Sequence, residues 1–79
     1  MPDVKIYSTP TCPYCIRTKN YLNEKGISFT NIDVSADEQG LQEMIKLSGQ
    51  MGVPVVIIDG EIIVGFDQNR INHKLGLSS

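Results

Sequence analysis

The 79-residue chain has few of the residues that small proteins use for cross-links or metal sites. It has no tryptophan, a single histidine, His73, and only two cysteines, Cys12 and Cys15. A structural zinc ion usually takes four cysteine or histidine ligands, so the three such side chains of one chain are one ligand too few for a site. The loop between the two cysteines is also too short to restrict the unfolded chain much. We therefore expect packing to stabilise the fold.

Basic blocks and long apolar segments are missing too. The formal net charge is −2 without a cluster of lysine and arginine, which makes nucleic acid and anionic membrane surfaces poor partner candidates. The longest apolar run, Val53 to Ile58, has a strand's length and contains a proline, so it cannot span a bilayer. Residues 1–8 lack the features of a signal peptide. We expect a cytoplasmic protein, where structural disulfides are rare.

Hydrophobic periodicity predicts one domain, residues 1–79, of alternating strands and helices. Val4 to Tyr7 alternates apolar and polar residues, which is typical of a strand. From Pro13 the apolar residues recur with a period near 3.6, which predicts a helix that Gly26 ends. Residues 27–34 alternate again and predict a second strand.

The second half of the chain predicts a helix, a hairpin and a last helix. Ser35 stands three residues before Glu38, which indicates a capping box at the start of a helix that Gly49 ends. Two β-branched runs flank Asp59-Gly60, which favours a tight hairpin whose strands are buried on both faces. A short helix capped by Asp67 closes the chain.

This element order, βαβαββα, predicts the fold class. The first βαβ unit makes strands one and two parallel, with a right-handed crossover. The hairpin adds two antiparallel strands, and helices cover both faces. We therefore expect an α/β protein with a mixed four-stranded sheet flanked by three helices.

The Cys12–Cys15 pair begins a predicted helix directly after a strand. The helix N-terminus has unpaired N–H groups and the positive end of the macrodipole, which stabilise a thiolate at Cys12 and lower its pKa. Cys15, one turn later, lies within disulfide reach but deeper. This arrangement favours a nucleophile and a resolving thiol in disulfide exchange.

Two other interpretations of the pair stay open. A dimer that pools ligands would hold a metal ion or an iron–sulfur cluster through Cys12. A passive disulfide is disfavoured by its tiny loop and by a reducing compartment. Pro54 also has two interpretations: a proline that simply marks the start of a strand, or a cis Val53–Pro54 bond that faces the cysteines.

The motifs together resemble a known family. The segment "YSTPTCPYC", a "GVP" about forty residues later, a "DG" hairpin and a "GF" before the last helix are similar to the glutaredoxins over nearly the whole chain. The resemblance implies a thioredoxin-like, glutaredoxin-type fold and glutathione-linked thiol–disulfide exchange. It implies that Cys12 is the nucleophile, Cys15 the resolving thiol and Pro54 a cis-proline. It also implies that Tyr14 walls the glutathione site and that the Val53 backbone pairs with the glutathione cysteine.

Three features depart from the family's common pattern. Thr9 stands where glutaredoxins commonly carry a lysine that meets a glutathione carboxylate, and Gly52 stands where they commonly have threonine. Gly65-Phe66-Asp67 replaces the Gly-Gly and aspartates that hold the γ-glutamyl end. Gly-Phe is closer to the redoxins that serve ribonucleotide reductase. Gln50 remains as a hydrogen-bond partner for a carboxylate, and Asp67 or Asn69 as a partner for an ammonium group.

We expect a glutaredoxin-type oxidoreductase that takes part in electron transport and cell redox homeostasis. It would reduce protein disulfides and glutathione mixed disulfides through Cys12 and Cys15, with glutathione as co-substrate and no permanently bound cofactor or metal. One alternative is a redoxin that thioredoxin reductase reduces and that donates electrons to ribonucleotide reductase or a similar enzyme. Another is an iron–sulfur or metal-binding module that uses Cys12 in a dimer. The residues expected to bind glutathione are Thr9, Tyr14, Gln50, Val53, Pro54, Gly65, Phe66 and Asp67.

Overall fold

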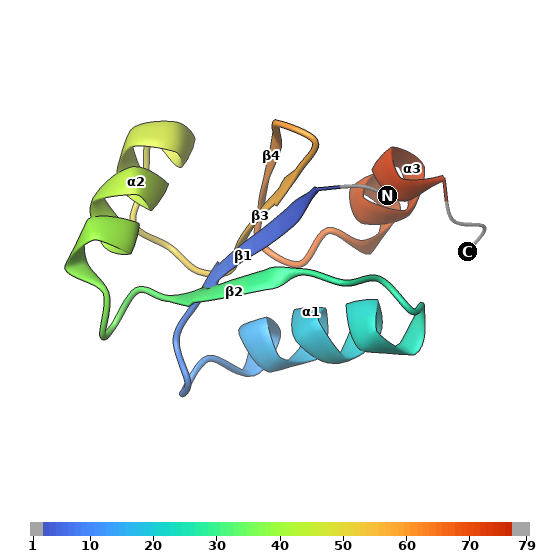
Figure 1. Ribbon diagram of the computed structural model, residues 1–79, viewed down its shortest axis with the longest axis horizontal. Coiled ribbons are helices and arrows are strands. Elements are labelled where there is room, and N and C mark those ends of the chain that lie inside the picture. Colours follow the sequence, from blue (N-terminus) through green and yellow to red (C-terminus); the bar gives the residue numbers. More distant parts are fainter. Residues whose placement is uncertain (1–2, 77–79) are drawn as a thin grey trace.

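The computed structural model, which describes residues 3–76, has the expected element order (Figure 1). The elements are β1 Val4–Ser8, α1 Pro13–Glu24, β2 Thr30–Asp33, α2 Glu38–Ser48, β3 Val55–Ile58, β4 Glu61–Val64 and α3 Gln68–Leu75. The strands form one sheet in the order β2-β1-β3-β4. As predicted, β1 pairs with β2 in parallel, whereas β3 pairs antiparallel with both β1 and β4. This is the thioredoxin-like arrangement.

Alternating side chains divide the core between the two faces of the sheet. On one face, Leu22 of α1 and Ile71 of α3 pack with strand residues such as Ile6. On the opposite face, Met44 of α2 packs with Tyr7 and neighbouring strand residues. Figure 1 shows the strands between α2 and α1. The sheet is thus covered on both faces, which fixes the loops at its ends where the cysteines lie.

Local signals set most of the element ends as predicted. Pro13 occupies the first turn of α1, and Gly26, with φ 70°, follows its last turn. Asp59 and Gly60 both have positive φ, 49° and 88°, as a two-residue hairpin turn requires. Asp67 caps α3 through a 3.2 Å hydrogen bond from the Arg70 N–H. These residues turn the chain where their backbone preferences favour it.

The predicted capping box at Ser35 is wrong. Asp37 is the N-cap of α2, and its carboxylate accepts the Gly40 N–H at 3.0 Å. The Ser35 hydroxyl instead donates to the Asp33 carboxylate at 2.5 Å, which holds a turn between β2 and α2. The Ser35 hydrogen bonds also hold the pKa of Asp33 below its usual value. Because the Ser35 hydroxyl is bonded to Asp33, the helix begins later, where Asp37 can cap it.

Two further predictions about the strands need correction. The second strand begins at Thr30 rather than at Ile27, because the Ile27 N–H donates to the Leu22 carbonyl at 2.9 Å and closes the end of α1. Burial of the hairpin on both faces is also incomplete, since Val64 is 50% exposed. Val64 belongs to β4, the edge strand of the sheet. An edge strand has a neighbour on one side only, so part of its surface stays open.

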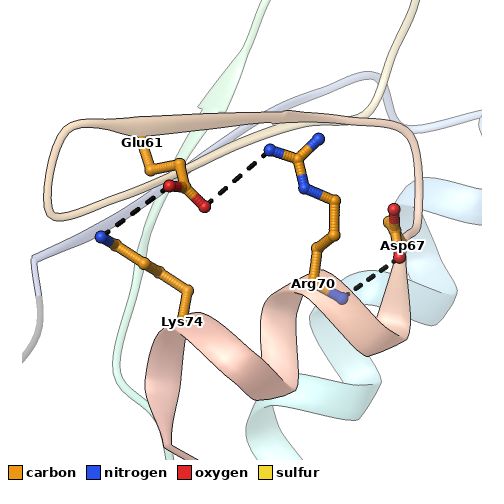
Figure 2. A network of polar contacts seen from close by, with 4 residues as sticks. All are labelled: Glu61, Asp67, Arg70 and Lys74. Atoms are coloured by element: carbon orange, nitrogen blue, oxygen red, sulfur yellow. Dashed lines mark hydrogen bonds and ion pairs between the residues drawn. The ribbon is translucent and has the colours of Figure 1, made fainter.

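Ion pairs join the hairpin to the last helix (Figure 2). The Glu61 carboxylate of β4 lies 3.9 Å from the Arg70 guanidinium and 3.9 Å from the Lys74 ammonium, both on α3. These side chains are partly exposed, and exposed pairs of this kind add roughly 0–1 kcal/mol. The apolar contacts of Ile71 therefore dominate the docking of α3. No helix among residues 3–76 is long and apolar enough to cross a membrane.

Candidate active site

Cys12 lies where the loop after β1 meets helix α1. It is the N-cap residue of α1, with φ −89° and ψ 114°. Its Sγ accepts a hydrogen bond from the Cys15 N–H at 3.3 Å, so sulfur stands where an oxygen usually caps a helix. The Cys12 N–H donates to the Thr9 carbonyl at 3.4 Å. The unpaired N–H groups and the positive end of the macrodipole therefore favour negative charge on this sulfur.

The two thiols differ in how tightly they hold a proton. Burial alone raises the pKa of Cys12, but hydrogen bonds from Cys15 and the Tyr14 backbone, with the charge of Lys19, hold that pKa below its usual value. Cys15 is fully buried, and burial followed by its hydrogen bond with Cys12 raises its pKa to about 11. Both cysteines are free thiols in this structure. Cys12 therefore forms a thiolate more readily than Cys15, which keeps its proton at neutral pH.

Lys19 is a residue of this site that we did not single out from the sequence. Its positive charge lowers the pKa of both cysteines. It stands four residues after Cys15 on α1, and side chains at this spacing share one side of a helix. The signal was present in the sequence, as a lysine one turn beyond the second cysteine of a predicted helix.

The segment that precedes β3 faces the cysteine pair. The Val53–Pro54 peptide bond is cis, as the resemblance implied. The Val53 carbonyl lies 3.9 Å from the Cys12 Sγ, although 41 positions separate the two residues. Pro54 is buried, and its carbonyl accepts the Gly65 N–H at 2.8 Å. Gly65 has φ 82°, which favours glycine. The loop beside Cys12 is thus held at the end of β4.

Gln50 directs its side-chain amide at its own loop. The Oε1 atom accepts the Gly52 N–H at 2.5 Å, and Nε2 donates to the Gly52 carbonyl at 3.0 Å. Nε2 also donates to the Ser48 hydroxyl at 3.3 Å. Both N–H bonds and the oxygen of this amide therefore have a partner within the protein.

Tyr14 and Thr9 lie on either side of Cys12 in the chain. Tyr14 is 59% exposed, and the Arg17 guanidinium carbon lies 5.6 Å from the centroid of its ring. Thr9 is half-buried and, besides accepting from Cys12, contributes a backbone hydrogen bond that lowers the pKa of Cys15. The exposed Tyr14 ring, with a cation against it, is available to a ligand near Cys12.

Phe66 and Asp67 take part in the fold. The Phe66 ring packs at 5.7 Å and 59° against the Tyr21 ring, at the edge of the core. The Tyr21 hydroxyl donates in turn to the Asn72 side chain of α3. One oxygen of the Asp67 carboxylate accepts the Arg70 N–H, as Figure 2 shows. Asp67 is only half-buried, so its other oxygen can still accept a hydrogen bond.

The described part of the chain, residues 3–76, brings no group of three or more His, Cys, Asp or Glu side chains together in a way that would hold a metal ion. His73 is exposed on α3.

Comparison with known proteins agrees with this geometry. The family model described as "Glutaredoxin" matches residues 4–63. An uncharacterized glutaredoxin-like 8.6 kDa protein from the rubredoxin operon of Clostridium pasteurianum is 54% identical over 69 residues, which cover 87% of this chain and 92% of that protein. Glutaredoxin 3 of Escherichia coli K12 is 43% identical over 67 residues, 85% of this chain and 81% of that protein. The crystal structure of a glutaredoxin from Archaeoglobus fulgidus superposes with a TM-score of 0.83, at 26% identity, over 95% of this chain and 87% of that one.

Proposed function

The chain belongs to the glutaredoxin family, and from that membership we propose that it is a glutathione-linked thiol–disulfide oxidoreductase of the cytoplasm. Its substrates would be protein disulfides and mixed disulfides between glutathione and proteins. The observation that carries the proposal is the position of the Cys12 Sγ. It accepts the Cys15 N–H at the start of α1 and lies 3.9 Å from the Val53 carbonyl. The Cys15 N–H stabilises a thiolate at this sulfur, and the Val53 carbonyl places it next to backbone that an extended thiol substrate would contact.

The first step is attack by the Cys12 thiolate on one sulfur of the substrate disulfide. The S–S bond of the substrate breaks, a new S–S bond to Cys12 forms, and the departing sulfur leaves as a thiolate that takes a proton from water. With a glutathionylated protein, the protein thiol departs and glutathione stays on Cys12. A free glutathione thiolate then attacks this mixed disulfide, releases oxidised glutathione and restores the Cys12 thiolate.

Protein disulfides follow a second route that requires Cys15. After the first attack the substrate is attached to Cys12 through one sulfur. Cys15 loses its proton and attacks the Cys12 sulfur, so the Cys12–Cys15 disulfide forms and the substrate leaves with both sulfurs reduced. Two molecules of glutathione, or a reductase, then return both thiols. Burial of Cys15 keeps it from external disulfides, so it meets only the sulfur already attached to Cys12.

Glutathione would bind across the mouth of the cysteine pair. The Tyr14 ring forms one wall, and the Val53 backbone pairs with the glutathione cysteine. Thr9 lies near one carboxylate end, and Gly65 with Phe66 and Asp67 lies near the γ-glutamyl end. Two observations support this placement: the ring of Tyr14 is 59% exposed, and the Gly65 N–H is bonded to Pro54 beside Val53.

A second electron donor is the alternative within the same chemistry. Thr9 supplies no charge for a glutathione carboxylate, and Phe66 fills the position after Gly65 by packing on Tyr21. Both features favour a redoxin that thioredoxin reductase reduces and that serves ribonucleotide reductase or a similar enzyme. The alternative of another class, a dimeric iron–sulfur module using Cys12, predicts coloured protein. An absorption spectrum of freshly purified protein tests it.

The deciding experiment compares two electron supplies on wild type, Cys12→Ser and Cys15→Ser. One supply is glutathione with glutathione reductase, and the other is thioredoxin reductase with NADPH. We expect Cys12→Ser to lose all activity, and Cys15→Ser to keep removal of glutathione from mixed disulfides while losing reduction of protein disulfides. If wild type is active only with thioredoxin reductase and NADPH, the electron donor is that reductase and not glutathione. Full activity of Cys12→Ser would overturn the assignment of the nucleophile.

A further inference from the structure

The loop between α2 and β3 contains an internal contact whose parts come from three nearby residues. The Gln50 amide bonds to both the N–H and the carbonyl of Gly52, a contact that we call the amide bracket. Ser48 supports it from the end of α2, since its hydroxyl accepts from Gln50 Nε2 and lies 2.6 Å from the Met44 carbonyl. The bracket thus links the helix end to the residue just before Val53.

Gly52 is the residue that leaves room for this contact. A Cβ atom at position 52 would lie 2.6 Å from the Gln50 Oε1, closer than such atoms approach. The backbone of Gly52 does not have the positive φ that would itself favour glycine. A side chain at position 52 therefore fits only if the Gln50 amide moves out of this contact. Gln50 and Gly52 act as a pair.

The bracket determines how the Val53 backbone is presented. The Gly52–Val53 peptide is planar and trans, since the Val53–Pro54 bond is the only cis bond within residues 3–76. In a trans peptide the carbonyl and the N–H point in opposite directions. The hydrogen bond from Gln50 Nε2 to the Gly52 carbonyl therefore also sets the direction of the Val53 N–H. The next carbonyl, that of Val53, is the one that lies 3.9 Å from the Cys12 Sγ.

We infer that Gln50 is a positioning residue that acts through Gly52 on the Val53 backbone, and not a direct ligand of a glutathione carboxylate. This inference rests on the proposed function, because it assumes that the Val53 backbone pairs with the substrate cysteine. A direct ligand needs free hydrogen-bonding groups, whereas both N–H bonds of this amide are already engaged. Contact with a carboxylate would break the hydrogen bonds that hold the loop.

The test uses Gln50→Ala, Gly52→Ala and the double variant, with Gln42→Ala, an exposed glutamine on α2, as the matched control. Gly52→Ala is the decisive variant because it keeps Gln50 but pushes its amide out of the bracket. The substrate is a glutathionylated peptide, with glutathione and glutathione reductase in excess. We expect each single variant to raise the KM for this peptide about three- to tenfold, with a smaller change in kcat.

The double variant should be no worse than either single variant, because both remove the same contact. Alkylation of Cys12 should keep its pH profile in all variants, since Cys15 and the helix N-terminus stabilise that thiolate. A direct ligand predicts the opposite pattern, in which Gly52→Ala leaves KM unchanged or lowers it while Gln50→Ala raises it. That pattern would overturn the inference, as would a pair of effects that simply add.

Hydrogen exchange distinguishes a failure of the positioning role of Gln50 from a failure of the proposed function. The Gly52 N–H, which donates to Gln50, should exchange faster in Gln50→Ala than in wild type and Gln42→Ala, whatever the substrate is. If wild type does not act on the glutathionylated peptide, the proposed function fails, and the KM comparison is made with a peptide disulfide, which also docks on Val53. Equal exchange in wild type and Gln50→Ala, or an unchanged KM in both single variants, would refute the positioning role.

Discussion

The difference in acidity between the two thiols predicts which of them a small alkylating reagent modifies. Only the thiolate reacts, so the rate at a given pH follows the thiolate fraction and access. With a pKa of about 11, Cys15 carries roughly one thiolate in ten thousand at pH 7. A thiol with a pKa of 9.0 carries about one per cent thiolate at this pH. Since the pKa of Cys12 is held below 9.0, we expect Cys12 to react at least about 100 times faster than Cys15.

The assay treats reduced protein with iodoacetamide between pH 4 and pH 10, roughly the range over which protein thiols titrate, and follows each cysteine by peptide mass spectrometry. The rate at Cys12 should reach its plateau at a lower pH than that of a free cysteine, whereas the rate at Cys15 should still rise at the upper end. Cys12→Ser is the control for Cys15, because burial keeps its pKa raised when the Cys12 charge is gone. In urea both cysteines should react at similar rates.

Two results would refute this reasoning. One is alkylation of Cys15 at a rate comparable with that of Cys12 at neutral pH. The other is a midpoint for Cys12 at or above that of a free cysteine, which would mean that the hydrogen bond from the Cys15 N–H does not offset burial. The first result would make Cys15 the nucleophile, and the second would mean that the start of α1 does not activate Cys12.

Three further predictions concern other positions. Thr9→Lys should tighten glutathione binding several-fold, because a charged donor at a partly exposed carboxylate contributes roughly 1 kcal/mol. Added salt should reverse part of the gain. If wild type and Thr9→Lys bind glutathione equally well in a low-salt titration, position 9 does not face the carboxylate. Between pH 8 and pH 10 Cys15 should lower the unfolding free energy of the reduced protein by about 1–2 kcal/mol relative to Cys15→Ala, because the unfolded Cys15 thiol loses its proton there while the folded one, with a pKa of about 11, keeps it. Urea unfolding checks this, and an equal pH dependence in Cys15→Ala would contradict it. Gly40→Ala should destabilise the protein, because its Cβ would lie 2.6 Å from the Ile32 Cγ2. Overpacking of this kind costs about 1–3 kcal/mol, more than the gain of about 1 kcal/mol in helix propensity. Thermal unfolding measures the difference, with Gln42→Ala as the control, and a variant as stable as wild type would mean that α2 moves away from β2 at no cost.

The order of the elements followed from the sequence because its signals are local. A proline in the first turn of α1, the Asp59-Gly60 pair and an N-cap aspartate at Asp67 each act within a few residues, and the structure uses all of them. Competition between neighbours was harder to predict. Ser35 and Asp37 both qualify as N-caps, and the choice depends on Asp33, which takes up Ser35 where β2 ends.

Contacts between distant segments account for what the sequence did not reveal. Gly40 is a poor helix residue in local terms, yet it lies buried where α2 approaches Ile32 of β2. The amide of Gln50 looked available for a ligand, but its hydrogen bonds depend on the path of a loop that no periodicity encodes. The approach of Val53 to Cys12 likewise came from the family resemblance, since spacing alone left the proline with two interpretations.

The site that results links the protonation of the two thiols to the order of the proposed steps. Cys15 holds its proton tightly in the reduced protein, and two of the causes, its hydrogen bond with Cys12 and the negative charge there, depend on the Cys12 thiolate. Once Cys12 carries a substrate through a disulfide, that charge is gone. Burial then still raises the pKa of Cys15, but the Thr9 backbone and Lys19 lower it without opposition from Cys12. The resolving thiol therefore becomes easier to ionise at the stage when its attack is needed, and it stays protonated while Cys12 is the free nucleophile.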